Sequence, residues 1–362
     1  MEVDVKKIAV VGSINTDFVF TAKHLPKPSE TIKGETFETY FGGKGANVSV
    51  AVSRLLEKVE LFGAVGDDIH SKQNIQNLAE QKVNTENVEV FKNEIGGSAC
   101  ITVGDKTNSI MVVPGANGKY TKTNIKKVIN KITDCDVVAT QLETDFAGVE
   151  YLIGQVYKKK KILVFNPSPI RKLPKKLLNM CSYIIVNEVE IKQLPGYKDD
   201  EQILKSFNGR LILTKGGEGA FYYADGKVCS VPSIKTKVVN TTGAGDTFLA
   251  AFSVAILNDK NIKEAIEFAN VCAGIKVGKP GTQTGMPTLK EVQNYLEQKG
   301  KRKMAVHVAP HEEGWQVKSA KAKKAYRVTK TQEEAIKIAK KVAKNKDTST
   351  TIQGRHGKFR AE

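Results

Sequence analysis

The sequence predicts an α/β fold in which a mostly parallel sheet is flanked by helices on both faces. Short β-branched runs alternate with helical patterns through most of the first 300 residues, and this alternation is typical of sheets built from βα units. Two segments, 18–41 and 88–113, interrupt the alternation and have the pattern of extended hairpins, the second with a turn at 104–106. We expect the two hairpins to form a small separate sheet inserted between βα units.

The individual elements follow from apolar runs bounded by turn residues. Strands are expected at 8–11, 59–64, 137–141, 162–166, 183–187 and 210–214, and helices at 46–57, 71–81, 123–131, 147–159, 187–194 and 248–257. Ligands of such sheets gather at the carboxyl ends of the strands. We therefore expect the functional residues directly after these strands.

Composition sets broad limits on the protein class. At 362 residues the chain has room for one large domain and a smaller one. The five cysteines are scattered and never in Cys-x-x-Cys spacing, so reduced thiols in a cytoplasmic protein are expected. The start lacks a signal-peptide pattern, and no apolar run approaches the ~20 residues of a membrane span. We expect a cytoplasmic protein without membrane contact.

The end of the chain reads as a separate small domain. The sequence predicts a large body at 1–298, closed by a helix at 289–298, then a Lys-rich linker at 299–303 and a tail at 304–362. Within the tail we expect strands at 305–309, 315–319, 325–329 and 350–359, and a helix begun by Thr331 and Glu334, which have capping-box spacing. Residues 301–362 carry a net charge of +11 of the total +17. A solvated Lys-rich face explains this charge as well as nucleic acid does, so specific nucleic-acid binding is not expected.

One stretch of the sequence contains residue types that are suited to phosphoryl transfer. Residues 240–248 read Asn-Thr-Thr-Gly-Ala-Gly-Asp-Thr-Phe and lead into an apolar run typical of a buried helix. Glycines let backbone approach a ligand closely, and the N–H groups of a helix start bind anions. We interpret Gly243, Ala244, Gly245 and Asp246 as a catalytic turn, with Asp246 as general base. Alone, such a turn is more often a simple connector.

Six further motifs resemble those of a known protein family and occur in the same order as in that family. They are Gly-Ser-Ile-Asn-Thr-Asp at 12–17, Phe-Gly-Gly-Lys-Gly-Ala-Asn at 41–47, Gln-Leu-Glu at 141–143, Asn-Pro-Ser-Pro at 166–169, the pair Asn187 and Glu190, and Thr-Lys-Gly-Gly-Glu-Gly at 214–219. From about residue 6 to 298 the chain resembles the ribokinase family of sugar kinases, also called the phosphofructokinase-B type. The resemblance implies a ribokinase-like fold and ATP-dependent phosphorylation of D-ribose at its 5-hydroxyl. Deoxyribose, a hexose or a nucleoside remains an alternative substrate.

The resemblance also implies the binding residues. A polyhydroxylated sugar suits a site of carboxylates and amides, because each hydroxyl both donates and accepts. The positions that match the family's sugar site are Asn15, Thr16, Asp17, Gly43, Lys44, Gly45, Ala46, Asn47, Glu143 and Asp246. Those that match its nucleotide site are Asn187, Thr214, Lys215, Gly216, Gly217, Glu218, Gly219, Gly245 and Asn270. Asn187 and Glu190 are three apart, share one face if helical, and correspond to the family's Mg²⁺ pair, with Glu190 acting partly through water.

A cation site of the family is altered in this chain. Family members typically have an aspartate where this chain has Asn240, and that aspartate helps to bind an activating K⁺. The other positions are Thr242, Lys276, Lys279, Gly281 and Gly285, which are expected to offer mainly backbone carbonyls. Because the amide of Asn240 lacks the full charge, K⁺ activation is in question.

The resemblances also lead to expectations about the hairpins and about the tail. In the resembled family the hairpin sheet is a lid over the sugar that often joins a homodimer, so we expect a homodimer through the lid. The tail, with Val-His-Val at 306–308, Gly-Trp at 314–315 and Gly-Arg-His-Gly at 354–357, resembles a small bacterial family of unknown function. A different class of function remains open: a partner-binding or nucleic-acid-binding tail carried by the kinase body as a scaffold. The intact catalytic turn argues against that reading.

Overall fold

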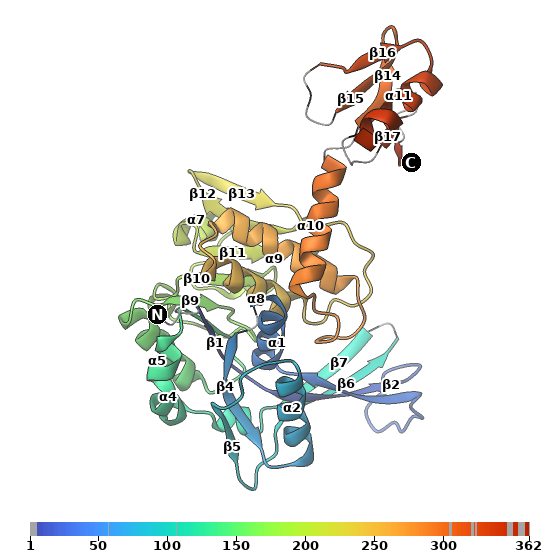
Figure 1. The fold of residues 1–362 in the computed structure, drawn as a ribbon. Helices are drawn as coiled ribbons and strands as arrows, with labels where there is room; N and C mark the ends of the chain where they lie inside the picture. The colour runs from blue at the N-terminus through green and yellow to red at the C-terminus, as the bar shows by residue number, and fades with distance from the viewer. Residues whose placement is uncertain are drawn as a thin grey trace. The chain divides into compact units, whose positions relative to one another are not determined.

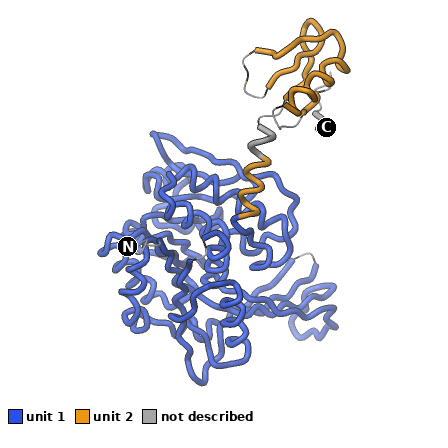
Figure 2. Tube along the Cα trace, in the orientation of Figure 1, with its two compact units in different colours: residues 1–289 blue, residues 290–362 orange. Residues whose placement is uncertain are grey.

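The computed structural model describes residues 6–56, 58–105, 107–303, 306–319, 322, 324–345, 350–353 and 359–361, without the side chains of 299–303 and 359–361. The chain forms two compact units, residues 1–289 and residues 290–362 (Figure 2). Each unit is described by itself below.

A nine-stranded sheet forms the centre of the first unit (Figure 1). Its order is β13-β12-β11-β10-β9-β8-β1-β4-β5, parallel from β11 to β5, with β12 and β13 antiparallel at one edge. The predicted mostly parallel sheet is therefore confirmed. The strands are β1 (Ile8–Val11), β4 (Val59–Gly66), β5 (Val88–Phe91), β8 (Val137–Thr140), β9 (Ile162–Phe165), β10 (Tyr183–Asn187), β11 (Leu211–Thr214), β12 (Ala220–Ala224) and β13 (Lys227–Val231).

Helices cover both faces of this sheet. The apolar side chains of each strand alternate between the two faces. Ala9 and Val11 belong to a core cluster with residues of α4, α5, α6 and α7, whereas α1, α8 and α9 pack together on the opposite face. The helices are α1 (Lys44–Leu56), α2 (Ile69–Glu80), α3 (Ala116–Lys119), α4 (Lys122–Asp134), α5 (Phe146–Lys158), α6 (Lys175–Leu178), α7 (Asp200–Phe207), α8 (Ala244–Leu257) and α9 (Ile262–Val277).

The inserted sheet has four strands in the order β3-β2-β6-β7. They are β2 (Asn15–Thr21), β3 (Thr36–Gly42), β6 (Gly97–Gly104) and β7 (Thr107–Val113), and the two antiparallel pairs meet through a parallel β2–β6 pairing. The expected segment 88–113 is longer than this hairpin, because β5 at its start pairs with β4 in the main sheet. Of the expected turn 104–106, residue 106 lies outside the described residues.

Two local predictions require correction or completion. The helix expected at 187–194 is wrong: Asn187 ends β10, and only a 3₁₀ turn, η1 (Ile191–Gln193), follows. The β12–β13 hairpin was missed, although Asp225 and Gly226 both have positive φ at its tip and Asp-Gly is a strong hairpin signal. Helices α7 and α9 were missed as well.

The second unit contains a five-stranded sheet in the order β16-β15-β14-β17-β18 with α11 packed on it. Its elements are α10 (Leu289–Lys303, which begins at the last residue of the first unit), β14 (Val306–His311), β15 (Gly314–Ser319), β16 (Arg327–Thr329), α11 (Gln332–Asn345), β17 (Thr350–Gln353) and β18 (Phe359–Ala361). Residues 299–303, predicted to be a linker, are helical and complete α10. The single closing strand expected at 350–359 is two antiparallel strands.

The tail motif at 354–357 and residue 305 lie outside the described residues. Trp315 is 5% exposed and packs in the small core with the apolar stripe of α11. No helix in the described part of the chain is both long and apolar enough to cross a membrane.

Candidate active site

Part of the predicted site converges on one cavity at the carboxyl ends of the parallel strands. The cavity has a volume of about 230 Å³. It lies among the residues that follow β9, β10 and β11 and the starts of α1 and α8. Seven sequence-predicted residues line it, namely Lys44, Asn187, Glu190, Thr214, Gly243, Gly245 and Asp246, and they are joined by Asn166, Ser168, Ile185, Val186 and Phe248.

The turn into α8 has the geometry of an anion cradle. Gly243 has φ +78°, and a Cβ there would come within 2.7 Å of Thr282 Cγ2, so the turn requires glycine. No side chain caps the first turn of α8, and a Cβ on Gly245 would meet nothing within 4 Å. The N–H of Ala244 donates to the carbonyl of Thr241 at 3.1 Å. The N–H groups of Gly243, Gly245 and Asp246, with the positive end of the helix dipole, are therefore the ones suited to a phosphoryl group.

Asp246 is held at this turn by a chain of amides. Its carboxylate is 8% exposed and accepts a hydrogen bond from Asn47 Nδ2 at 2.9 Å. Gln283 Nε2 donates to Asn47 Oδ1 at 3.1 Å, and Asn77 Nδ2 donates to Gln283 Oε1 at 2.9 Å. Each link fixes the orientation of the next amide. Sequence reasoning found Asn47 but missed Gln283 and Asn77, since no local pattern joins residues about two hundred positions apart.

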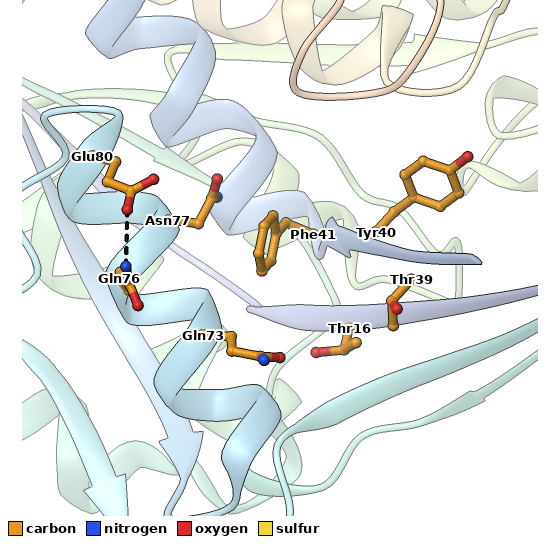
Figure 3. A pocket seen from close by; sticks show the side chains of 8 residues that line it. All are labelled: Thr16, Thr39, Tyr40, Phe41, Gln73, Gln76, Asn77 and Glu80. Atoms are coloured by element: carbon orange, nitrogen blue, oxygen red, sulfur yellow. Dashed lines mark hydrogen bonds between the residues drawn. The ribbon is translucent and has the colours of Figure 1, made fainter.

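The outer end of this chain reaches a second cavity. A hollow of about 300 Å³ lies between α2 and the lid strands β2 and β3. Figure 3 shows Asn77 on α2 beside Phe41 of β3, with Thr16 of β2 nearby. The amide chain thus connects the lid side of the molecule with Asp246.

Glycines bring the start of α1 against the loop after β1. Gly43 has φ +86°, and a Cβ there would lie 2.6 Å from the backbone N of Asn15. A Cβ on Gly45 would lie 2.5 Å from the carbonyl carbon of Gly12. Only glycine allows this close approach, which explains the Gly-Gly-Lys-Gly motif. Glu143 locks the contact, because its Oε2 accepts from Ser13 Oγ at 2.5 Å and from Lys44 N at 3.1 Å.

Two asparagines outside the motifs hold the predicted sugar residues of β2. Asn117 Nδ2 donates to Asn15 Oδ1 at 2.8 Å, and Asn74 Nδ2 donates to Thr16 Oγ1 at 2.8 Å. Asn117 also donates to the carbonyl of Ile14 and accepts from its N–H. Both asparagines were missed by sequence reasoning, because they lie on other elements of the body. Their bonds preorganise Asn15 and Thr16.

The site concentrates negative charge around one ammonium group. Burial, with a smaller effect from the charges of Glu143 and Asp246, raises the pKa of Asp17 to about 6. Burial lowers the pKa of Lys44, but Asp246, Glu143 and Glu190 outweigh that effect and hold it above its ordinary value. Lys44 therefore stays charged. Its charge is stabilised by carboxylates of both the expected sugar side and the expected phosphate side.

Asn187 and Glu190 are brought together by a tight turn after β10. Asn187 N–H donates to Glu190 Oε2 at 2.9 Å, and Glu190 N–H donates back to Asn187 Oδ1 at 2.9 Å. Asn166 Nδ2 also donates to Oε2, at 3.3 Å. Among the described hydrogen bonds of this carboxylate none involves Oε1, so that oxygen fits a water-mediated contact with Mg²⁺. The described residues contain no group of three or more His, Cys, Asp or Glu side chains gathered for a metal.

The expected nucleotide loop follows β11 as a 3₁₀ turn, η2 (Gly216–Glu218). Gly219 has φ +102°, and a Cβ there would lie 2.1 Å from the carbonyl of Val231, whereas a Cβ on Gly216 or Gly217 would meet nothing within 4 Å. The two glycines thus leave backbone open to a ligand. Lys215 is engaged elsewhere, because its Nζ pairs with Asp200 at 2.8 Å.

Asn270 does not line the cavity with these residues. Its Nδ2 donates to the carbonyls of Val231 at 2.9 Å and Pro232 at 3.3 Å. The structure thus gives Asn270 the role of holding the segment after β13. Contact with a nucleotide remains a prediction.

Two of the expected K⁺ residues, Asn240 and Lys276, have oxygens that already accept hydrogen bonds within the chain. The ammonium of Lys276, whose side chain is fully buried, donates to the carbonyl of Asn240 at 2.8 Å and lies 3.5 Å from its Oδ1. The backbone carbonyl of Lys276, expected to be a ligand, accepts from Lys279 N–H at 3.0 Å. Oxygens expected for a free cation are thus engaged by this chain's own groups. Thr242 N–H also donates a hydrogen bond to Asn240 Oδ1, at 2.8 Å.

Comparisons with known proteins agree with this geometry. Residues 5–289 match a family described as "pfkB family carbohydrate kinase", and residues 306–362 match one described as "Uncharacterized protein conserved in bacteria". Ribokinase of Lactococcus lactis is 37% identical over 294 residues, which cover 81% of this chain and 97% of that protein. Deoxyribokinase of Salmonella typhi is 30% identical over 300 residues, which cover 80% and 98%.

Among solved structures, Arabidopsis thaliana ribokinase complexed with ribose and ATP is similar with a TM-score of 0.74 at 28% identity, covering 81% of this chain and 99% of that one. The ribokinase-like fold predicted from the sequence is confirmed, as is the relationship of the tail. The family match spans the whole sheet, the lid and the anion cradle. The chain therefore belongs to the pfkB family of carbohydrate kinases, phosphotransferases that act on an alcohol group.

Proposed function

We propose that the protein transfers the γ-phosphoryl group of ATP to the 5-hydroxyl of D-ribose. The observation that carries the proposal is the placement of Asp246 at the uncapped N-terminus of α8, held by Asn47 and lining one cavity with Lys44. A carboxylate beside an anion cradle suits attack by an alcohol on a phosphoryl group. The ribokinase names of the relatives favour ribose, and the deoxyribokinase relative keeps deoxyribose as the alternative.

Asp246 acts as general base in this mechanism. As the 5-oxygen of ribose forms its bond to the γ-phosphorus, the bond from that phosphorus to the ADP oxygen breaks, and the hydroxyl proton passes to a carboxylate oxygen of Asp246. A primary hydroxyl is a very weak acid, so the proton leaves as the new bond forms. The hydrogen bond from Asn47 to Oδ2 leaves the second carboxylate oxygen to face the substrate.

The cradle and Lys44 stabilise the transferring group. The backbone N–H groups of Gly243, Gly245 and Asp246 and the α8 dipole meet the charge on the equatorial phosphoryl oxygens. The ammonium of Lys44 lies among Asp246, Glu143 and Glu190 and adds a full positive charge to the same cavity. Most of the barrier reduction comes from this preorganised arrangement rather than from the proton transfer.

The remaining predicted residues bind the two substrates. The carboxylates of Asp17 and Glu143 accept hydrogen bonds from sugar hydroxyls, and the amide of Asn15 donates one. The open backbone of Gly216 and Gly217 lies along the nucleotide. Glu190, oriented by Asn187, holds Mg²⁺ partly through water. The bound Mg²⁺ supplies charge neutralisation for the nucleotide phosphates.

We also propose that two copies join through the lid. The strand register places Phe20, Phe37, Met111 and Val113 on one face of the inserted sheet. They are 44%, 57%, 65% and 45% exposed. An exposed apolar face of this kind marks an interface. A partner lid would bury it.

The substrate is tested by steady-state kinetics with ATP and a panel of free ribose, deoxyribose, hexoses and nucleosides. Ribose is expected to have the highest kcat/KM. A preference for a nucleoside or a hexose would reject the proposal. In the same assay, Asp246→Asn should lower kcat by about 10²- to 10⁴-fold, while calorimetric titration shows ribose and nucleotide still bound. Near-normal turnover in that variant would reject Asp246 as the base.

A further inference from the structure

Lys276 places a fully buried amino group beside the segment that leads into α8. Burial lowers the pKa of this group, and the negative charge of Asp246 opposes that effect. It lies in the last turn of α9 and is 0% exposed, one of the largest side chains so completely buried. The described ion pairs do not include it. Burying a charged group without a paired carboxylate costs several kcal/mol unless polar groups compensate. The surroundings of Lys276 must therefore contain groups that stabilise its charged form.

The two hydrogen-bond acceptors described for this amino group both belong to Asn240. Lys276 Nζ donates to the Asn240 carbonyl at 2.8 Å and lies 3.5 Å from Oδ1. The backbone of this segment is tied to the end of the same helix, because the N–H groups of Val239 and Asn240 both donate to the carbonyl of Val277. The negative end of the α9 dipole also favours a cation here.

Asn240 in turn shapes the start of α8. Its Oδ1 accepts from Thr242 N–H at 2.8 Å, and Ala244 N–H donates to the carbonyl of Thr241 at 3.1 Å. These bonds set the path of the chain into Gly243, where the cradle begins. A shift of the ammonium would thus move the turn that meets the phosphoryl group.

We propose that Lys276 is a built-in monovalent cation that positions the cradle and takes the place of K⁺. The ammonium occupies the Asn240 oxygens that a bound K⁺ would require, and Asn240 is neutral where family members typically have an aspartate. The enzyme should therefore work at full rate without K⁺. Lys276 is a positioning residue in this view, because it acts on the transferred group through Asn240 and Gly243. The inference deepens the proposed kinase function and rests on it.

The first test is the cation dependence of the unaltered enzyme. The assay uses ATP and the panel sugar with the highest kcat/KM, in KCl, NaCl or tetramethylammonium chloride at constant ionic strength. The expected result is the same kcat in all three salts. A saturable rise in kcat with K⁺ would overturn the inference.

The second test removes the ammonium. Lys276→Ala should lower kcat by about 100-fold, as misplacement of a preorganised site does, with a smaller change in the KM for sugar. KCl or methylammonium chloride should restore kcat by entering the vacated space. Lys276→Met fills that space without charge and should lose kcat without being restored. Lys263→Ala, at an exposed lysine on the same helix, is the matched control and should match the unaltered enzyme.

A binding measurement makes the test independent of turnover. The double variant Lys276→Ala, Asn240→Asp restores a carboxylate beside an empty cation position, so its melting temperature should rise with KCl more than with NaCl or tetramethylammonium chloride. The unaltered protein should show no K⁺-specific rise. Full kcat of a folded Lys276→Ala in tetramethylammonium chloride would overturn the inference, as would a K⁺-specific rise in the unaltered protein. If no panel sugar is phosphorylated, the proposed function fails, and the melting temperatures still decide the cation question.

Discussion

Replacing Asp17 by asparagine should stabilise the unliganded fold while it damages sugar binding. The pKa of Asp17 rises from 3.8 to about 6, mainly through burial and then through Glu143 and Asp246. Its ionised form is therefore disfavoured in the folded protein. A raised acid pKa means that the folded state holds the proton more tightly than the unfolded state does.

The sign and size follow from linkage. Below about pH 4, Asp17 is protonated in the folded and in the unfolded state and has little effect on stability. Between about pH 4 and pH 6 the folded state binds more protons than the unfolded state, so the free energy of unfolding falls as pH rises. The shift of about two pH units corresponds to a loss of about 3 kcal/mol above pH 7. Asparagine removes that loss. Asp17→Asn should thus be more stable than the unaltered protein by up to about 3 kcal/mol near pH 8 and by about 0.5 kcal/mol near pH 4.

Urea unfolding, followed by circular dichroism at several pH values, measures this difference. The only tryptophan of the chain, Trp315, lies in the tail, so its fluorescence reports the second unit separately and should not change between variants. In calorimetric titration, ribose should bind Asp17→Asn more weakly at neutral pH. A stability difference that does not grow with pH would refute the electrostatic reasoning, and unchanged ribose affinity would refute the sugar contact.

Three further predictions concern the amide chain, the lid and the tail. Gln283→Ala removes the donor to Asn47 and should lower kcat by about 2- to 10-fold, the value of one hydrogen bond. Gln76→Ala, at an exposed glutamine of α2, is the control variant in the same steady-state kinetics. An equal loss of kcat in both variants would contradict an orienting role of Gln283. Met111→Asp should turn the dimer into a monomer in light scattering, because a twofold symmetric interface would contain the new charge twice, once from each copy. If the unaltered protein is already monomeric, the proposed dimer is rejected. A chain truncated after residue 303 should keep its kcat and its KM for sugar, because the residues of the candidate site precede residue 290, and lost activity would show that the tail supports the site.

Local patterns in the sequence were sufficient for much of the fold and for the chemical motifs. Strands β1 and β10 have the predicted bounds, and the glycines before α1 and α8 are identified by backbone constraints that neighbouring residues impose. The helix expected at 187–194 failed because Asn187 and Glu190 bond each other's backbone in a turn, which competes with a helix. That competition depends on side-chain geometry, which an apolar pattern does not contain.

The sequence by itself determined the family and the α/β sheet, and it supplied the prediction that Asp246 is the general base, because these depend on short motifs and on the alternation of apolar residues. The tertiary structure decided which partners those residues meet. Gln283 reaches Asn47 across 236 positions, and Lys276 reaches Asn240 across 36. The motif pattern predicts a cation site at Lys276 through its backbone carbonyl, whereas the fold brings its ammonium there. Which end of a long side chain reaches a site depends on the packing of α9 against the turn before α8, and no local pattern contains that distance.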